Sequence, residues 1–253
     1  MKEVLLKGQG LCKTFPQRNG KNTVLDRLDV EIYGGDFTVI MGASGAGKST
    51  LLYALSGMDS ISGGEVLYKD RPISGLSEGK MAALRGREFG FVFQQTHLVS
   101  NLTLYENVAV AGYVSKKSPP RETASRAEAL LERMNVGKAK DRLPNQVSGG
   151  EAQRAAIARA MINDPGLLFA DEPTGALNRS SSEEVLDLLS RLNRDGQSIL
   201  MVTHDVRAAL RGNRILYLED GKILDELALP VYEAEGARER ENQVSGWLAR
   251  LRW

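Results

Sequence analysis

The apolar positions of this chain form short runs that end at glycine or polar residues, and these runs predict strands. Three of them, FTVIM at 37–41, LLFAD at 167–171 and ILMV at 199–202, are apolar enough to be buried strands of a parallel sheet. The last belongs to a predicted strand that ends at His204. LDRLDVEI at 25–32 alternates, which predicts a half-exposed strand. Residues 4–15 also predict strand, followed by a turn at 16–22, and RILYLEDGKI at 214–223 predicts a hairpin turning at Asp220-Gly221.

In the middle of the chain, the apolar residues recur at the spacing of a helix. The stretch 104–145 predicts helices interrupted by SKKSPPRE at 115–122, and Ala127, Leu130, Leu131 and Met134 share one helix face. A further helix is expected to open at Ser148 and to stop before Pro165, and residues 180–196 predict an amphipathic helix. Strands that alternate with helices indicate an α/β fold with a separate, mostly helical lobe.

Composition narrows the classes of protein. The chain has 253 residues, enough for one large α/β domain, and its 33 Lys and Arg nearly balance its 32 Asp and Glu. No global positive charge favours nucleic acid, so no nucleic-acid partner is expected. The single Cys12 cannot form an internal disulfide, and no apolar run reaches the about 20 residues of a membrane span. We therefore expect a cytoplasmic protein that reaches a membrane only through a partner.

The stretch VIMGASGAGKSTLL at 39–52 matches the phosphate-binding loop pattern GxxxxGK[ST] between a predicted strand and a predicted helix. Its glycines allow a tight turn in which successive N–H groups point at one anion. Lys48 would reach the β- and γ-phosphates of a nucleoside triphosphate, and Ser49 would bind Mg²⁺. The predicted nucleotide-binding residues of this loop are Gly42, Ala43, Ser44, Gly45, Ala46, Gly47, Lys48, Ser49 and Thr50.

Polar residues also follow several predicted strands. Asp171 and Glu172 follow LLFA, Gln94 follows FGFVF, and His204 ends the predicted strand that contains ILMV. Because ligands bind at the carboxyl edge of a parallel sheet, these positions favour chemistry over a solvated turn or a structural histidine. Phe15 lies beside Lys13 and Thr14, where it could pack in the core or stack on an adenine ring. His97 has no such context and is expected in a loop.

The motifs GASGAGKST, Gln94, VSGGE, LLFADEPTGALN and THD resemble, in order and spacing, an ATP-binding cassette (ABC) ATPase over nearly the whole chain. The resemblance implies a P-loop NTPase with a RecA-like core, an antiparallel β subdomain and an inserted α-helical subdomain at about 96–160. It places a single ABC ATPase domain at 1–229. Residues 230–253 form a C-terminal extension, expected to be helical because Trp247, Leu248 and Leu251 share helical spacing.

The resemblance also implies residue roles. Asp171 would hold Mg²⁺ through water, and Glu172 would orient or deprotonate the attacking water. Gln94 would contact Mg²⁺ and that water, and His204 would contact the γ-phosphate. The signature residues Ser148, Gly149, Gly150 and Glu151 would bind the ATP held by a second copy, so that two chains enclose two ATP molecules head to tail.

Two departures from the family pattern stand out. The signature carries Val147 and Glu151 where LSGGQ is common, and we expect activity to survive these changes. Asn178 replaces the usual aspartate of the D-loop. It removes a charge but keeps hydrogen-bonding capacity, which places in doubt the coupling between the two ATP sites.

Within the family, the sequence looks most like ATPases that serve lipoprotein release, macrolide export and antimicrobial-peptide export or resistance. This implies a subunit that hydrolyses ATP for an integral-membrane permease, at the cytoplasmic face of the cell membrane. Lys116 to Arg121 would lie near the permease or form a solvated loop. The alternatives are a cell-division ATPase that regulates a cell-wall hydrolase, and a soluble ABC ATPase that acts on DNA or ribosomes. The C-terminal helix could dock on its own domain or on a partner.

Overall fold

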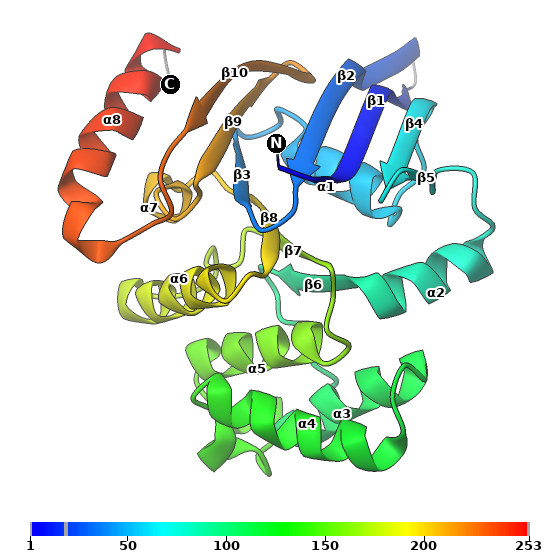
Figure 1. Cartoon of the computed structure of the whole chain (residues 1–253), viewed down its shortest axis with the longest axis vertical. Coiled ribbons are helices and arrows are strands. Elements are labelled where there is room, and N and C mark those ends of the chain that lie inside the picture. The colour runs from blue at the N-terminus through cyan, green and yellow to red at the C-terminus, as the bar shows by residue number, and fades with distance from the viewer. Residues whose placement is uncertain (1, 18–19, 252–253) are drawn as a thin grey trace. The chain divides into compact units, whose positions relative to one another are not determined.

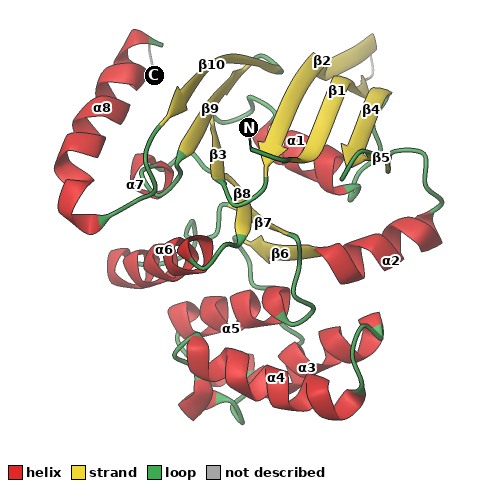
Figure 2. Cartoon of the chain, viewed as in Figure 1, coloured by secondary structure: helices red, strands yellow, loops and turns green. Residues whose placement is uncertain are grey.

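The computed structural model describes residues 2–17 and 20–251 and divides the chain into two compact units. The first unit comprises residues 1–77 and 193–253, and the second comprises residues 78–192. Figure 1 shows the elements of both in chain order, and Figure 2 separates their helices from their strands. The α/β character predicted from the sequence is confirmed, and each unit is described on its own below.

In its described residues, the first unit combines two sheets with three complete α-helices, the last two residues of a fourth and one short 3-10 helix. Its elements are β1 (Val4–Gln17), β2 (Gly20–Tyr33), β3 (Phe37–Met41), α1 (Lys48–Ser56), β4 (Gly63–Tyr68), β5 (Arg71–Pro72), the last two residues of α6 (Arg179–Arg194), β8 (Ser198–Val202), α7 (Val206–Ala209), β9 (Arg214–Glu219), β10 (Lys222–Ala228), the short 3-10 helix η3 (Ala234–Gly236) and α8 (Ala237–Arg250).

An antiparallel sheet of order β2-β1-β4-β5 forms the amino-terminal part of this unit. The turn expected at 16–22 is shorter than predicted, because Pro16 pairs with Lys21 and Gln17 with Gly20 in the β1–β2 ladder. The cause is backbone pairing that continues through polar residues, which a hydrophobic pattern does not register. The two residues expected at the tip of the turn, 18 and 19, lie outside the described residues.

The second sheet of this unit has the order β10-β9-β3-β8, in which β3 pairs in parallel with both β8 and β9. All five residues of β3 and all five of β8 are buried, as their apolar runs predicted. The β9–β10 hairpin is confirmed, with Asp220-Gly221 between its strands. Strand β8 ends at Val202 and not at His204, because its pairing with β3 ends at the Ile40–Val202 pair.

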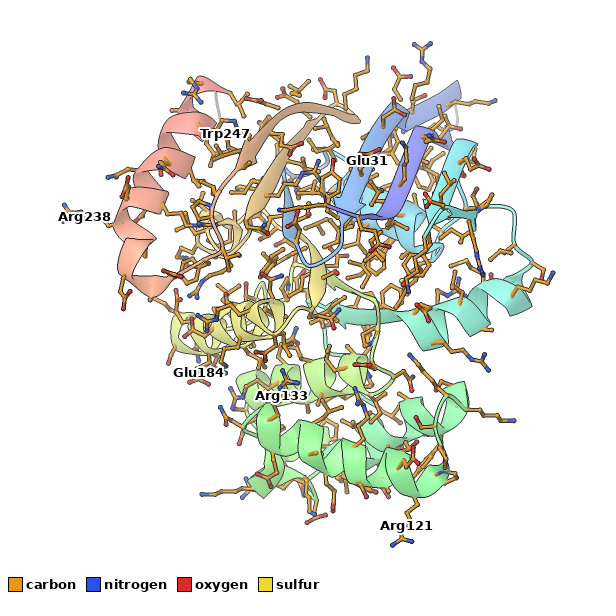
Figure 3. All side chains as sticks on the ribbon, viewed as in Figure 1. Glu31, Arg121, Arg133, Glu184, Arg238 and Trp247 are labelled. Carbon is orange, nitrogen blue, oxygen red and sulfur yellow. The ribbon has the colours of Figure 1, made fainter. Side chains whose placement is uncertain are left out.

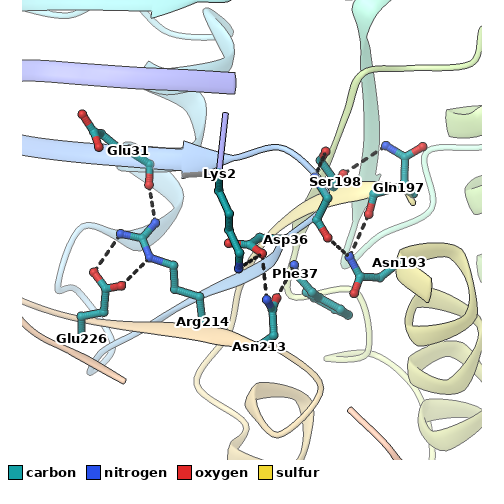
Figure 4. Close-up of polar contacts among 11 residues, drawn as sticks. Lys2, Glu31, Asp36, Phe37, Asn193, Gln197, Ser198, Asn213, Arg214 and Glu226 are labelled. Atoms are coloured by element: carbon teal, nitrogen blue, oxygen red, sulfur yellow. Dashed lines mark hydrogen bonds and ion pairs between the residues drawn. The ribbon is translucent and has the colours of Figure 1, made fainter. Parts of the chain in front are cut away.

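Polar contacts fix the entrance to β3, the strand that leads to the glycine-rich loop. The side chain of Asn213 accepts a hydrogen bond from the Phe37 N–H at 2.7 Å and donates one to Asp36 at 2.8 Å (Figure 4). Lys2 pairs with the same Asp36 carboxylate at 2.6 Å. Because Asp36, Phe37 and Asn213 are buried, the bonds among them hold β3 in register with the segment that leads into β9.

The C-terminal helix α8 docks on its own unit. Trp247 and Leu248 are buried, and the Trp247 indole donates to the Asp225 carboxylate at 2.9 Å, whereas Arg238 projects outward (Figure 3). The buried guanidinium of Arg240 donates to the carbonyl oxygens of Leu210 at 2.6 Å and Pro230 at 2.8 Å. Residues Ala237–Arg250 form a helix, and these contacts hold it on its own unit.

The second unit is mostly helical and contains one pair of parallel strands, β6 and β7. Its elements are α2 (Glu78–Glu88), β6 (Phe89–Phe93), α3 (Leu104–Ser115), α4 (Pro120–Arg133), the 3-10 helices η1 (Gly137–Ala139) and η2 (Pro144–Gln146), α5 (Gly149–Met161), β7 (Leu167–Asp171) and α6 up to Leu192. The predicted core positions Ala127, Leu130, Leu131 and Met134 are all buried. Among the described residues, no helix of either unit is long and apolar enough to cross a bilayer.

Candidate functional site

The glycine-rich loop at 42–47 connects buried β3 to α1 and leaves several of its residues at the surface. Ala43, Ser44 and Gly45 are exposed. Gly42 tolerates no side chain, because an added Cβ would lie 2.2 Å from the Leu218 carbonyl oxygen. Gly47 precedes α1 with a φ of 100°, a left-handed conformation that strongly favours glycine. The sequence therefore dictates a tight loop that ends at a helix N-terminus.

Lys48 is the first residue of α1 and is folded back over the loop. Its ammonium group donates to the carbonyl oxygens of Gly42 at 2.8 Å and Ala43 at 3.0 Å, and the residue is only 8% exposed. The first turn of α1 carries no acidic residue, and Gly47 has no side chain with which to cap it. The N-terminal N–H groups of α1 and the Lys48 charge thus lie together on a surface suited to an anion.

A second helix N-terminus lies in the second unit, at the start of α5. Ser148 is its N-cap and forms a reciprocal capping box with Glu151. The Glu151 carboxylate accepts bonds from the Ser148 N–H and hydroxyl, both at 2.8 Å, and the Glu151 N–H donates back to the hydroxyl at 3.2 Å. These bonds, led by the one from the Ser148 N–H, lower the pKa of the Glu151 carboxyl. A carboxylate of the chain itself therefore occupies donors at this helix start.

The carboxyl ends of β6 and β7 bring the polar residues of the second unit together. Asp171 is the last residue of β7 and is 9% exposed. Glu172 follows it with a φ of 47°, a left-handed conformation that is uncommon for a residue with a side chain. The Gln94 side chain lies against Gly175, where an added Cβ would meet the Gln94 amide nitrogen at 2.9 Å. Gln94 thus reaches the turn that begins at Glu172.

His204 belongs to the first unit and lies in the short connection between β8 and α7. It is exposed, and the residues on both sides of it are fixed. The Thr203 N–H donates to the Ile40 carbonyl at 3.2 Å, and Asp205 caps α7 by accepting from the Arg207 N–H at 2.9 Å. Although burial acts to raise it, the pKa of the Asp205 carboxyl is lowered by its bonds to Arg207. The connection therefore presents the imidazole from an ordered backbone.

Phe15 is 39% exposed near the end of β1, and the Lys13 ammonium lies 4.9 Å from its ring centre. An exposed ring leaves room for stacking, so the prediction of adenine contact stands as a prediction. His97 lies in a loop as expected, with its ring edge-on to Phe93 at 5.4 Å between centroids.

The predicted site residues divide between the two units. The first unit contains Phe15, Gly42–Thr50 and His204, and the second contains Gln94, Ser148–Glu151, Asp171 and Glu172. Hydroxyl, carboxylate and amide oxygens of Ser49, Asp171 and Gln94 are the hard donors that Mg²⁺ prefers, so these residues fit that ion chemically.

One buried residue near Gln94 and Glu172 was not predicted from the sequence: Gln153 of α5, whose amide binds two carbonyl groups of the second unit. The available signal was a polar residue among the alanines of the buried helix face. The capping box was not predicted either, although Ser148-x-x-Glu151 is its sequence signature.

Comparisons with known proteins agree with this geometry. Residues 25–175 match the ABC transporter family. The chain is 42% identical over 220 residues, or 87% of its length, to the macrolide export ATP-binding/permease protein MacB 1/2 of Paracoccus denitrificans (strain Pd 1222). It spans only about a third of that relative, 33% of its length.

Two solved structures share the fold. One is a dimeric structure of MJ0796, a bacterial ABC transporter cassette, and the other is a dimeric post-hydrolysis state of the same ATP-binding cassette bound to ADP and Pi. Each has a TM-score of 0.82 and 35% sequence identity, and the alignment covers 90% of this chain and 100% of the solved one.

The fold and the motifs define a P-loop ATPase. More narrowly, the chain belongs to the ABC transporter family and is an ATP-binding cassette, similar to the macrolide export ATP-binding/permease protein and to MJ0796.

Proposed function

We propose that two copies of this chain enclose two ATP molecules and use their hydrolysis to drive an integral-membrane permease that exports a peptide, lipoprotein or drug-like substrate or transmits force across the membrane. The observation that carries the proposal is the presence of two distinct helix N-termini, α1 with Lys48 and α5 with Ser148. One would hold the phosphates of its own ATP, and the other would engage the ATP of the second copy. The dimeric state of MJ0796 supports this arrangement.

Each predicted residue then has a chemical task. Lys48 binds the β- and γ-phosphates, and Ser49, Asp171 and Gln94 hold Mg²⁺ directly or through water. When bound, Mg²⁺ neutralises charge on the phosphate oxygens. Glu172 orients the attacking water and accepts its proton, and His204 fixes the γ-phosphate in line with that water.

A permease partner is supported by an apolar strip on α3. Val110, Tyr113 and Val114, which share one face at helical spacing, are 40%, 40% and 76% exposed. Beside Tyr113, residues 116–120 line an open hollow of about 730 Å³, and Arg121 projects outward from the start of α4 (Figure 3). Large apolar side chains gathered in this way favour contact with another protein. The chain would then lie at the cytoplasmic face of a membrane through this partner.

The cell-division alternative shares the same ATPase chemistry and differs only in the partner. Cross-linking in native membranes, followed by identification of the captured membrane protein, distinguishes the two. A permease with transport or force-transmitting domains supports the proposal, and a partner that acts on a cell-wall hydrolase supports the alternative. Retention on ribosomes or DNA instead would support a soluble ABC ATPase.

The decisive experiment uses Glu172→Gln. This variant keeps the side-chain shape and removes the base, so it should bind ATP, lose at least about 100-fold in kcat and accumulate as an ATP-bound dimer. Size-exclusion chromatography with and without ATP measures the dimer, and phosphate release measures turnover. Hydrolysis at the wild-type rate would show that Glu172 is not the base, and a monomer at saturating ATP would contradict the two-copy site.

A further inference from the structure

One glutamine of α5 is buried inside the second unit. Gln153 is 1% exposed, and its neighbours on the buried face of the helix are apolar, including Ala152, Ala156 and Ile157. A buried amide destabilises a protein unless hydrogen bonds replace its lost contact with water. The position of this side chain is therefore set by the groups that it binds.

Those groups are two backbone carbonyls at the carboxyl ends of neighbouring parallel strands. The Gln153 amide nitrogen donates to the Phe93 oxygen at 2.9 Å and to the Pro173 oxygen at 2.8 Å. Phe93 ends β6 and immediately precedes Gln94, and Pro173 immediately follows Glu172. One side-chain amide thus joins the backbone beside both residues that are predicted to act on the attacking water.

The same amide also contains a group that destabilises the fold. Its oxygen is buried and has no hydrogen-bond partner among the described residues. An apolar residue of similar length would fill the space without leaving a buried acceptor unpaired. The contribution specific to glutamine is thus its pair of donated bonds, which restrain the turn in which Glu172 holds its left-handed φ of 47°.

Gln153 also lies on the helix that begins with the signature residues. Five residues separate it from Ser148, a rise of about 7.5 Å along one rigid helix. A shift of the α5 N-terminus therefore moves the Gln153 amide with it, and through the two carbonyls it moves the segments that carry Gln94 and Glu172.

We propose that Gln153 is a positioning residue that couples the start of α5 to Gln94 and Glu172 of the same chain. The inference rests on the proposed function, in which the α5 N-terminus engages the ATP of a second copy. Engagement of that ATP would then adjust the position of the chain's own Glu172, so that occupation of its signature helix raises the rate at which each copy hydrolyses its own ATP.

The test compares Gln153→Met, which keeps the length and removes both donors, with Gln243→Met, the same change at an exposed position of α8. Gln153→Met should lower kcat by about tenfold or more while the KM for ATP changes by less than about twofold, because the phosphate-binding loop is untouched. Gln243→Met should retain wild-type values. A wild-type kcat in Gln153→Met, or equal losses in both variants, would overturn the proposal.

A second variant separates positioning from simple loss of packing. In Gln153→Glu a carboxylate would face two carbonyl oxygens, whereas the protonated acid can donate to one of them. Its kcat relative to wild type should therefore rise as the pH falls from about 8.5 to about 6, since burial raises the pKa of such a carboxyl. A ratio of the two kcat values that does not change with pH would overturn the proposal. This ratio can be measured even if Gln153→Met fails to fold.

ATP-driven dimerisation of Glu172→Gln distinguishes failure of this inference from failure of the proposed function. If that dimer forms while Gln153→Met hydrolyses ATP normally, the positioning role is wrong and the two-copy site stands. If no dimer forms, the proposed function itself is contradicted.

Discussion

The starts of α1 and α5 are both helix N-termini beside glycines, since α1 follows Gly47 and α5 begins with Gly149 and Gly150, and they differ in the charge that they carry. At α1, no acidic residue occupies the first turn, and Lys48 adds a positive charge. At α5, Ser148 and Glu151 cap the helix, and the carboxylate accepts two bonds from the serine. The first turn of α1 thus contains no carboxylate, whereas the first turn of α5 contains the Glu151 carboxylate.

This difference in charge indicates that the N-termini of α1 and α5 can bind the same ATP molecule with different strengths. A helix start with no acidic residue in its first turn favours a bound anion such as phosphate, and the Lys48 charge lies beside it. A site filled by Glu151 must release or share its donors before it can bind a γ-phosphate. Binding at α5 is therefore expected to be weak in one copy and to depend on the ATP already held by another.

The largest effect is expected from changing Lys48 at the start of α1. Lys48→Ala removes the charge beside the α1 N-terminus and should lower ATP affinity by about 100-fold, or about 3 kcal/mol, with loss of ATPase activity. Equilibrium binding of a fluorescent ATP analogue measures this. Lys80→Ala on exposed α2 serves as the control and should bind normally. Unchanged affinity in Lys48→Ala would show that α1 is not the phosphate site.

The next largest effect is expected from changing Glu151 at the start of α5. Glu151→Gln preserves the capping geometry but removes the charge, so in the Glu172→Gln background it should tighten ATP-driven dimerisation by about three- to tenfold. Glu106→Gln is a matched control, because Thr103 and Glu106 form the same capping box at α3. It should leave dimerisation unchanged. Weaker dimerisation in Glu151→Gln would mean that the carboxylate assists nucleotide binding and does not compete with it.

The same carboxylate predicts a dependence of stability on pH. The pKa of Glu151 is lowered in the folded chain, so its contribution to the free energy of unfolding is fully present above the unfolded value of about 4.3. This contribution is lost as the pH falls through the folded pKa. Wild type should therefore melt above Glu151→Gln at about pH 6, and the two melting temperatures should converge toward about pH 3. A difference that persists in acid would contradict the capping role of the ionised carboxylate.

The smallest effect concerns a third helix start, that of α6. The Asn178 side chain accepts from the Ser181 N–H at 2.9 Å, so it caps this helix without a charge. Asn178→Asp keeps the cap, because asparagine and aspartate are about equally good N-caps, and melting should change by no more than about 2 °C. We expect a change of about two- to threefold in kcat, because the added charge lies in the D-loop motif. A loss of ATP binding would show that Asn178 belongs to the nucleotide site.

Local chemistry explains what the sequence could predict. Glycines with lysine and serine after an apolar strand define the loop at 42–50, and the continuous apolar runs of β3, β7 and β8 could be recognised because burial on both faces leaves no polar position. The hairpin turn at Asp220-Gly221 follows from the residues that such turns require. These features depend on near neighbours in the chain, and all are present in the structure.

Contacts between distant segments could not be predicted. The roles of Gln153 and Arg240 depend on carbonyl groups 10 to 60 residues away, and a carbonyl carries no sequence signature. The turn at 16–22 was overestimated because polar residues that pair through their backbones look the same in sequence as a loop. The left-handed conformation of Glu172 could not be predicted either, because the residue is not a glycine.

The central claim is that α1 of one copy and α5 of the other complete one ATP site. It is tested most directly by mixing two inactive variants, Lys48→Ala and Ser148→Asp, the second of which places a carboxylate where the γ-phosphate would bind. In a mixed dimer, one site loses both groups and the other keeps both intact. With random pairing, a measurable fraction of the wild-type ATPase rate, at most about a quarter, should return on mixing. If the mixture stays as inactive as either variant alone, the two helix starts do not meet in a shared site between copies.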